Sequence, residues 1–116
     1  MQTEPPIYPY QVAELQQQHT MIRDIILRLQ SGRDQHVNRN FIIINNILHF
    51  VSQGQPPRLY VPEALRSTYL EFYHNNQLAG HFGFHKLLHR IRSLFYWPKL
   101  RHSISQFLQA CRHANR

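Results

Sequence analysis

Apolar side chains recur at helical spacing near the start of the chain and again after residue 62, with β-branched runs between the two regions. Over residues 10–30 the pattern predicts one helix, or two if Thr20 caps the start of a second. Gly32 suits the position that follows a helix end. Residues 33–40 are polar and predict a loop.

The region after this loop has the pattern of a small antiparallel sheet. Two apolar, β-branched runs, residues 41–44 and 47–51, flank the pair Asn45-Asn46. Asparagine tolerates the positive φ that a tight hairpin turn needs, so the two runs predict a hairpin. Residues 58–61 form a third candidate strand. The chain up to residue 61 is therefore expected to hold one or two helices and a three-stranded antiparallel sheet.

Three further helices are expected after this sheet. The first begins at Pro62, which fits the first turn of a helix, and Glu63 favours the positive end of its dipole. Its buried stripe is predicted to contain Leu65, Tyr69, Phe72 and Tyr73. The second covers residues 84–95, with Phe84, Leu87, Leu88, Ile91 and Phe95 on one apolar face.

A break at Tyr96-Trp97-Pro98 is expected to separate the second helix from the last, which Pro98 opens. The apolar face of that last helix is predicted to contain Leu100, Ile104, Phe107, Leu108 and Cys111. Two short amphipathic helices across a tight break resemble a helix-turn-helix. The sequence thus predicts an α+β fold made of an extension, residues 1–61, and a helical C-terminal segment, residues 62–116.

The charge of the protein is confined to one part of the chain. Lysine and arginine number 13 and acids number 6, which gives a net charge of +7. All six acids lie in residues 1–71, where six arginines balance them. The last 45 residues contain no acid and carry Lys86, Arg90, Arg92, Lys99, Arg101, Arg112 and Arg116. Such an imbalance points to a polyanion, above all nucleic acid, and a merely solvated basic surface is the alternative.

Several classes of function find no support in the sequence. No apolar stretch reaches the length of a membrane span, and residues 1–9 lack a signal-peptide pattern. A single cysteine is compatible with a reducing compartment. The acids form no pair at helical spacing, and no Ser/His/Asp arrangement or phosphate-binding glycine loop occurs. Cys111 ends an apolar stripe without a nucleophile turn. We therefore expect neither an enzyme nor a small-molecule substrate.

His74, His81 and Cys111 together form a candidate metal site. Imidazole nitrogen and thiolate sulfur are ligands that zinc prefers, and a structural zinc site needs four. The position one helical turn after Cys111 is Ala114, which offers no ligand atom. From spacing alone, a zinc site and a core cysteine with unrelated histidines remain alternatives.

The same residues carry a family resemblance. The segments His74-Asn-Asn-Gln-Leu-Ala-Gly-His81-Phe-Gly83, Tyr96-Trp97-Pro98 and Ile104-x-x-Phe107-x-x-x-Cys111 resemble the N-terminal HHCC zinc-binding domain of retroviral and gypsy-type retrotransposon integrases. The likeness extends upstream through residues 46–48 and 61–66. The N-terminal helical part looks like the extension that precedes this domain in such integrases, so the resemblance covers about residues 10–116.

The resemblance implies that one zinc ion holds the helices together through two histidines and two cysteines. It makes His74, His81 and Cys111 ligands, whereas Ala114 stands where the family has its second cysteine. Three explanations remain open. The cysteine was replaced for study, the copy decayed or was adopted by a host, or His113 acts as fourth ligand. The resemblance thus implies zinc, with the fourth ligand of the family pattern missing from this chain.

The resemblance also implies partners. It implies binding to element DNA ends, self-association or contact with other integrase domains, and an intracellular location, nuclear or within a virus-like particle. The candidate phosphate-binding residues are Lys86, Arg90, Arg92, Lys99 and Arg101. Trp97 is expected in the core, with base stacking as the alternative. The family's catalytic carboxylates belong to a separate domain that would follow Arg116. An alternative is a host-adopted relative whose degenerate zinc site serves protein–protein interaction or dimerisation.

Overall fold

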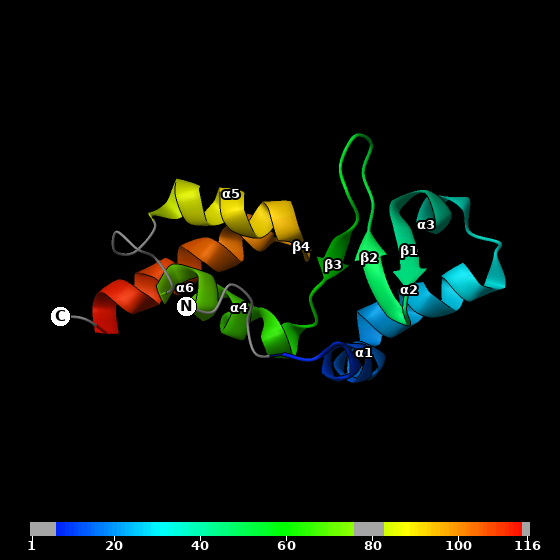
Figure 1. Cartoon of the computed structure of the whole chain (residues 1–116), viewed down its shortest axis with the longest axis horizontal. Coiled ribbons are helices and arrows are strands. Elements are labelled where there is room, and N and C mark those ends of the chain that lie inside the picture. The colour runs from blue at the N-terminus through cyan, green and yellow to red at the C-terminus, as the bar shows by residue number, and fades with distance from the viewer. Residues whose placement is uncertain (1–6, 76–82, 115–116) are drawn as a thin grey trace.

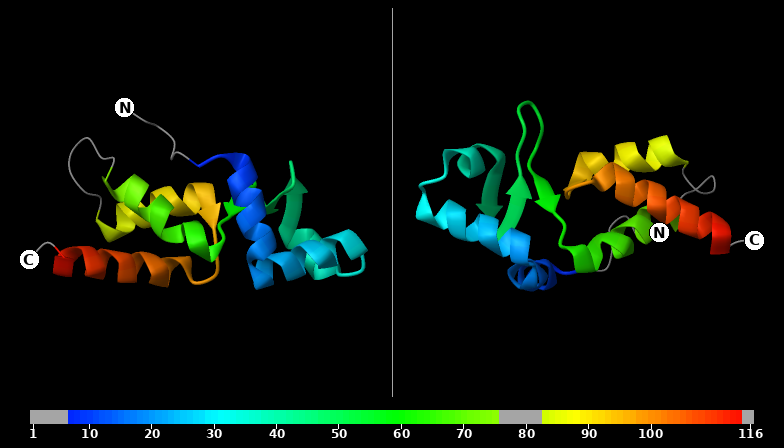
Figure 2. Two further views of the ribbon diagram at one scale, coloured as in Figure 1. Left: turned by 90° about the horizontal axis from the view of Figure 1, so that it is seen from below. Right: turned by 180° about the vertical axis from the view of Figure 1, so that it is seen from behind.

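The structure is a computed structural model that describes residues 7–75 and 83–114, the side chains of residues 112–114 excepted. A small sheet lies in the middle of an elongated molecule measuring 51 × 27 × 25 Å (Figure 1). Helices α1–α3 lie on one side of this sheet and α4–α6 on the other, and two further views agree (Figure 2). The predicted α+β class is therefore confirmed.

The first helical region consists of two helices, α1 (Pro9–Gln18) and α2 (Thr20–Ser31). The single residue between them, His19, has extended backbone, and its Nδ1 accepts a hydrogen bond from the Ile22 amide at 3.3 Å. His19, and not the expected Thr20, is therefore the N-cap of α2. Gly32 ends α2 as predicted, in the left-handed conformation with φ 68°.

The expected loop over residues 33–40 is wrong, because Gln35–Asn40 forms a short helix, α3. A carboxylate oxygen of Asp34 accepts the Val37 amide at 3.2 Å, which satisfies one of the first free N–H groups of the helix. Val37 is the one buried residue of α3. A cap and a single apolar anchor are thus enough to order a segment whose composition reads as polar loop.

The sheet has four strands in the order β1-β2-β3-β4. β1 (Phe41–Ile44) and β2 (Ile47–Phe50) form the predicted antiparallel hairpin, and β3 (Arg58–Tyr60) pairs antiparallel with β2. Asn45 and Asn46 adopt φ values of 52° and 66°, as a two-residue turn requires.

The fourth strand corrects the prediction of a three-stranded, purely antiparallel sheet. β4 (Phe95–Tyr96) pairs parallel with β3, with Leu59 opposite Phe95, and the Val61 amide donates to the Tyr96 carbonyl at 2.9 Å. Phe95 was expected to end a helix. A strand from the C-terminal segment thus completes the sheet of the extension, and the predicted boundary at residues 61 and 62 stays a prediction.

A fully buried glutamine fills the gap where β2 and β3 separate. The ladder pairs His49 with Leu59 and ends there, so Leu48 and Tyr60 face each other without pairing. The Gln16 amide nitrogen donates to both of their carbonyls, at 3.1 and 2.7 Å. The Gln16 Oε1 accepts the Leu48 amide at 2.8 Å. The Gln16 side chain, which comes from α1, therefore replaces the backbone hydrogen bonds that would otherwise join β2 to β3 at this position.

The C-terminal segment contains the three predicted helices, α4 (Glu63–Asn75), α5 (Phe84–Leu94) and α6 (Leu100–Ala114). α6 starts two residues after Pro98, and Lys99 before it has φ 60°. The buried residues of these helices include Tyr69, Leu70, Tyr73, Leu87, Leu88, Ile91 and Ile104. Leu65, Phe72, Phe84, Leu100, Phe107 and Leu108 pack against this core while partly buried.

Trp97 joins this core as predicted, which removes it as a stacking surface for bases. Its side chain is 1% exposed, and its indole Nε1 donates to the Ser103 hydroxyl at 3.1 Å. The Arg66 guanidinium lies 5.7 Å from the ring centroid. Within the described ranges, no helix is long and apolar enough to cross a membrane.

Candidate metal centre and nucleic-acid interface

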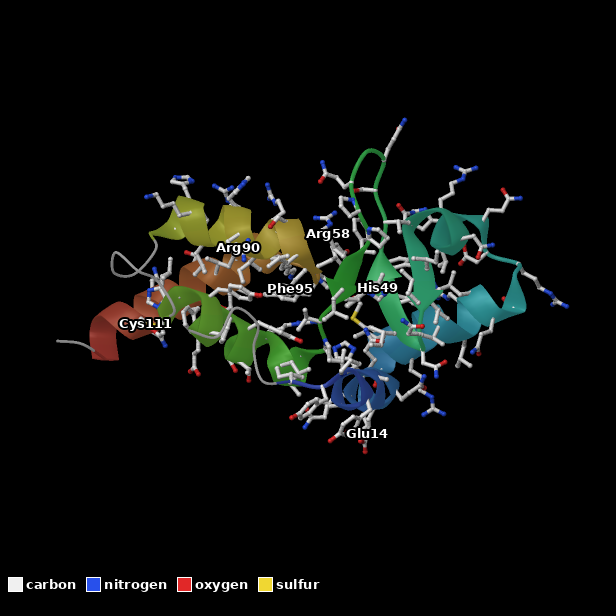
Figure 3. All side chains as sticks on the ribbon, viewed as in Figure 1. Glu14, His49, Arg58, Arg90, Phe95 and Cys111 are labelled. Atoms are coloured by element: carbon white, nitrogen blue, oxygen red, sulfur yellow. The ribbon has the colours of Figure 1, made fainter. Side chains whose placement is uncertain are left out.

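The candidate metal ligands lie on α4, α6 and the segment between α4 and α5. His74, in the last turn of α4, is buried, and its ring packs edge-on against Phe107 of α6 with centroids 5.4 Å apart. Cys111 is half-buried on α6 (Figure 3). It lies four residues after Phe107, a spacing that puts both residues on the same face of the helix. The fold therefore brings His74 to the face of α6 that carries the cysteine.

The remaining ligand candidates are not tested by the geometry. His81 lies outside the described residues, and so do the side chains of His113 and Ala114, although α6 continues to Ala114. Within residues 7–75 and 83–111, no three side chains of histidine, cysteine or acid gather as a metal-binding group. The donor types of His74, His81 and Cys111 suit zinc, and the set is one ligand short of a closed structural site.

The five basic residues predicted to contact phosphate are all exposed. Lys86, Arg90 and Arg92 project from α5, and Lys99 and Arg101 lie at the start of α6; together we call them the basic face. In the part of the chain that the structure describes, the ion pairs join Arg28 to acids of the extension and involve none of these five residues. Their charges are thus available to an external anion.

Two arginines of the basic face are held by aromatic rings. The guanidinium of Arg90 lies 5.4 Å from the ring centroid of Tyr73, and that of Arg101 lies 5.1 Å from Phe84. Such cation–π contacts restrict a long side chain without neutralising it. They therefore lower the entropy that these two arginines lose when they bind a ligand.

A shallow hollow opens between the starts of α5 and α6. Its volume is about 590 Å³, and it is lined by Phe84, Lys99, Arg101, His102 and Ser105. His102 and Ser105 were missed by the sequence analysis. The available signal was their spacing, since they lie three and six residues after Lys99 on α6. The hollow concentrates hydrogen-bond donors beside an aromatic ring.

Arg58 links the sheet to the helix that carries most of the basic face. Its guanidinium donates to the Arg92 carbonyl at 3.0 Å and to the Ser52 hydroxyl at 3.3 Å, and it lies 5.1 Å from the Phe50 ring (Figure 3). The Arg92 carbonyl belongs to the last turn of α5, where the helix dipole favours a cation. Arg58 therefore fixes the end of α5, and no sequence motif indicates this role.

Comparison with known protein families identifies the C-terminal segment. Residues 61–115 match the family described as "Integrase zinc binding domain". The match begins directly after β3 and covers α4, α5, β4 and α6. It therefore includes every residue of the basic face and all the candidate metal ligands.

Proposed function

Because residues 61–115 belong to the family of integrase zinc binding domains, we propose that this N-terminal integrase module binds the DNA ends of its element and supports assembly of integrase multimers. The module contributes binding and not bond chemistry, because the family domain found here is the non-catalytic one. Its place of action is where integration complexes form, in a virus-like particle or the nucleus.

The observation that carries the DNA-binding proposal is the basic face. Five exposed cations lie on α5 and at the start of α6, and no acid occurs anywhere from residue 72 onward. Cations that replace condensed counterions on a duplex give affinity that falls with salt, whatever the base sequence. Phosphate contact is therefore the proposed mode. No side chain stands out for reading bases.

Two double charge reversals, equal in net charge but placed on different parts of the chain, test this proposal. Lys86→Glu with Arg90→Glu reverses two charges on α5. Arg23→Glu with Arg39→Glu reverses two exposed charges of the extension and gives the same net charge. Fluorescence anisotropy with labelled duplex DNA over a salt series should show a large loss of affinity only for the α5 pair. Its slope of log K against log salt should fall by about 2.

Equal losses for the two pairs would mean that only net charge attracts DNA. Unchanged binding by the α5 pair would remove phosphate contact from that helix. Circular dichroism of each variant checks that α5 remains folded.

The zinc part of the proposal assigns His74, His81 and Cys111 as ligands. Bound zinc would supply a cross-link between the end of α4, the following segment and α6, and its binding energy would stabilise the fold. Metal analysis of the purified chain should find about one zinc per chain, and a chelator should lower the melting temperature. Ala114→Cys should then bind zinc more tightly, whereas Ala110→Cys, at an exposed position on α6, should not.

Ala114 also favours a second function. An alanine at the expected fourth ligand position fits a host-adopted relative in which the zinc site has degenerated and the module serves protein–protein interaction. Absence of zinc, with no chelator effect and no rescue by Ala114→Cys, would support this alternative. A zinc-loaded wild-type chain would contradict it.

A further inference from the structure

The outer edge of β1 carries unpaired backbone groups. In the hairpin, Ile44 and Ile42 pair with Ile47 and His49, and the Val51 amide donates to the Asn40 carbonyl at 2.8 Å. In a two-residue hairpin the residues that flank the turn exchange hydrogen bonds, so alternate residues point their amides outward. Ile43 is such a residue. Within the described ranges, no neighbouring backbone pairs with its amide and carbonyl.

The two edges of this sheet differ in how they are protected. β4, at one edge, has two residues, and Pro98 follows shortly after it. β1, at the other edge, has the sequence Phe-Ile-Ile-Ile, with no charge, proline or bulge. Proteins normally protect exposed sheet edges with short strands, charges, prolines or bulges, because an open apolar edge pairs with other strands. An unprotected edge such as β1 is therefore expected to have a partner.

The residues of β1 fit a second copy of the same strand. An antiparallel pair centred on Ile43 lets the two Ile43 residues exchange both hydrogen bonds across a two-fold axis. The same register places Ile42 of each copy opposite Ile44 of the other. Ile42 is 43% exposed in the single chain, so the pairing would cover it. Phe41 does not interfere, since its amide already donates to the Val37 carbonyl.

The side chain of Ile43 also lines a groove next to this edge. The groove has a volume of about 280 Å³ and lies between α1, α2 and the hairpin, where Glu14, Gln17 and Ile26 complete its wall. In the symmetric pairing, the partner's copy of Ile43 would lie on the same sheet face, beside this groove. The edge therefore offers both backbone hydrogen bonds and a place for an apolar side chain.

The charge distribution selects a second copy as the occupant. The net charge of +7 lies in residues 72–116, whereas residues 1–71 have six acids and six arginines. The basic helices α5 and α6 and the strand β1 lie on opposite sides of the molecule (Figure 1). Pairing through β1 therefore keeps the two basic segments far apart, which limits their repulsion.

We propose that the chain forms a two-fold dimer in which the β1 strands pair antiparallel about Ile43 and join the two four-stranded sheets. This inference rests on the self-association part of the proposed function and names its surface. The basic faces would lie at the two ends of such a dimer, free to contact two DNA segments.

Sedimentation analysis of the full chain over a concentration series tests the dimer. The wild-type chain should reach twice its mass of 14.0 kDa. Ile43→Pro removes the outward amide without breaking a hydrogen bond inside the hairpin, so it should leave a folded monomer. Ile42→Lys adds a charge to the pairing face and should also give a monomer, whereas Leu27→Lys, at a leucine on α2 that is more exposed than Ile42, should stay dimeric.

The outcomes separate this inference from the proposed function. A wild-type chain that is monomeric at every concentration would overturn both the β1 edge pairing and the self-association part of the proposed function. The DNA-binding part would still be decided by the anisotropy experiment. A dimer that persists in Ile42→Lys and Ile43→Pro would overturn only the edge. Melting curves identify a variant that fails to fold, and Ile42→Lys then decides alone, because its side chain points to solvent.

Discussion

Replacing Gln16 by leucine tests whether its side chain completes the sheet. Gln16 is 0% exposed, and its amide makes three hydrogen bonds to the backbone of Leu48 and Tyr60. Leucine has a similar size and no polar atom. The substitution would leave three buried backbone groups without a partner, at about 1–3 kcal/mol each.

The expected magnitude follows from two opposing effects. Burying a leucine side chain returns about 1.5–3 kcal/mol, which is less than the cost of the three orphaned groups. We expect a net loss of about 3 kcal/mol in the free energy of unfolding. At roughly 4 °C per kcal/mol for a chain of this size, the melting temperature should fall by about 12 °C.

Urea denaturation followed by circular dichroism measures this loss, with Gln17→Leu as the control. Gln17 is exposed, and its substitution should change stability by less than about 0.5 kcal/mol. Gln16→Glu should be worse than leucine at neutral pH, because a carboxylate would face two carbonyl oxygens. Acidification should recover part of its loss. If Gln16→Leu matched the wild type, β2 and β3 would be able to close the gap by themselves, and the reasoning would be refuted.

Three other outcomes follow from single residues of the extension. Burial, and then the charge of Arg66, lower the pKa of His19 below its ordinary value of 6.5. The stability that neutral His19 gives above pH 6.5 should therefore be lost as the pH falls below that value. His19→Asn, which caps the helix without titrating, should lose less stability between melts at pH 7 and pH 5. Asn46→Val should cost about 1–2 kcal/mol because of its φ of 66°, whereas Asn46→Gly should be neutral in the same melts. Arg58→Met should cost about 1–2 kcal/mol through the lost bond to the Arg92 carbonyl, and equal stability to the exposed-site control Arg39→Met would contradict that role.

The elements that could be predicted from sequence are those that local chemistry decides. The turn at Asn45-Asn46 needs positive φ, and Gly32 suits a helix end, so both were found. α3 was missed because one valine and an aspartate cap give it no apolar period. β4 was missed because its two residues are held by β3, a partner distant in sequence, and Phe95 also fits the helical stripe.

The candidate site was predictable to a similar degree. Exposure of the basic face followed from charge and from the apolar stripes of α5 and α6, which leave the cations on the outer faces. His74 was named as a candidate ligand from motif spacing and family resemblance, whereas its edge-on contact with Phe107 was not predicted. The support from Arg58 could not be foreseen, because its partner is a backbone carbonyl of a distant helix.

The parallel pair of β3 and β4 has a consequence for synthesis on the ribosome. β3 ends at Tyr60 and its partner begins at Phe95, with α4 and α5 between them. During translation, the extension therefore emerges with one side of β3 open until the later strand arrives. The sheet is finished only when most of the C-terminal segment exists. A nascent chain released before residue 96 would present two open sheet edges, which makes early termination products candidates for aggregation.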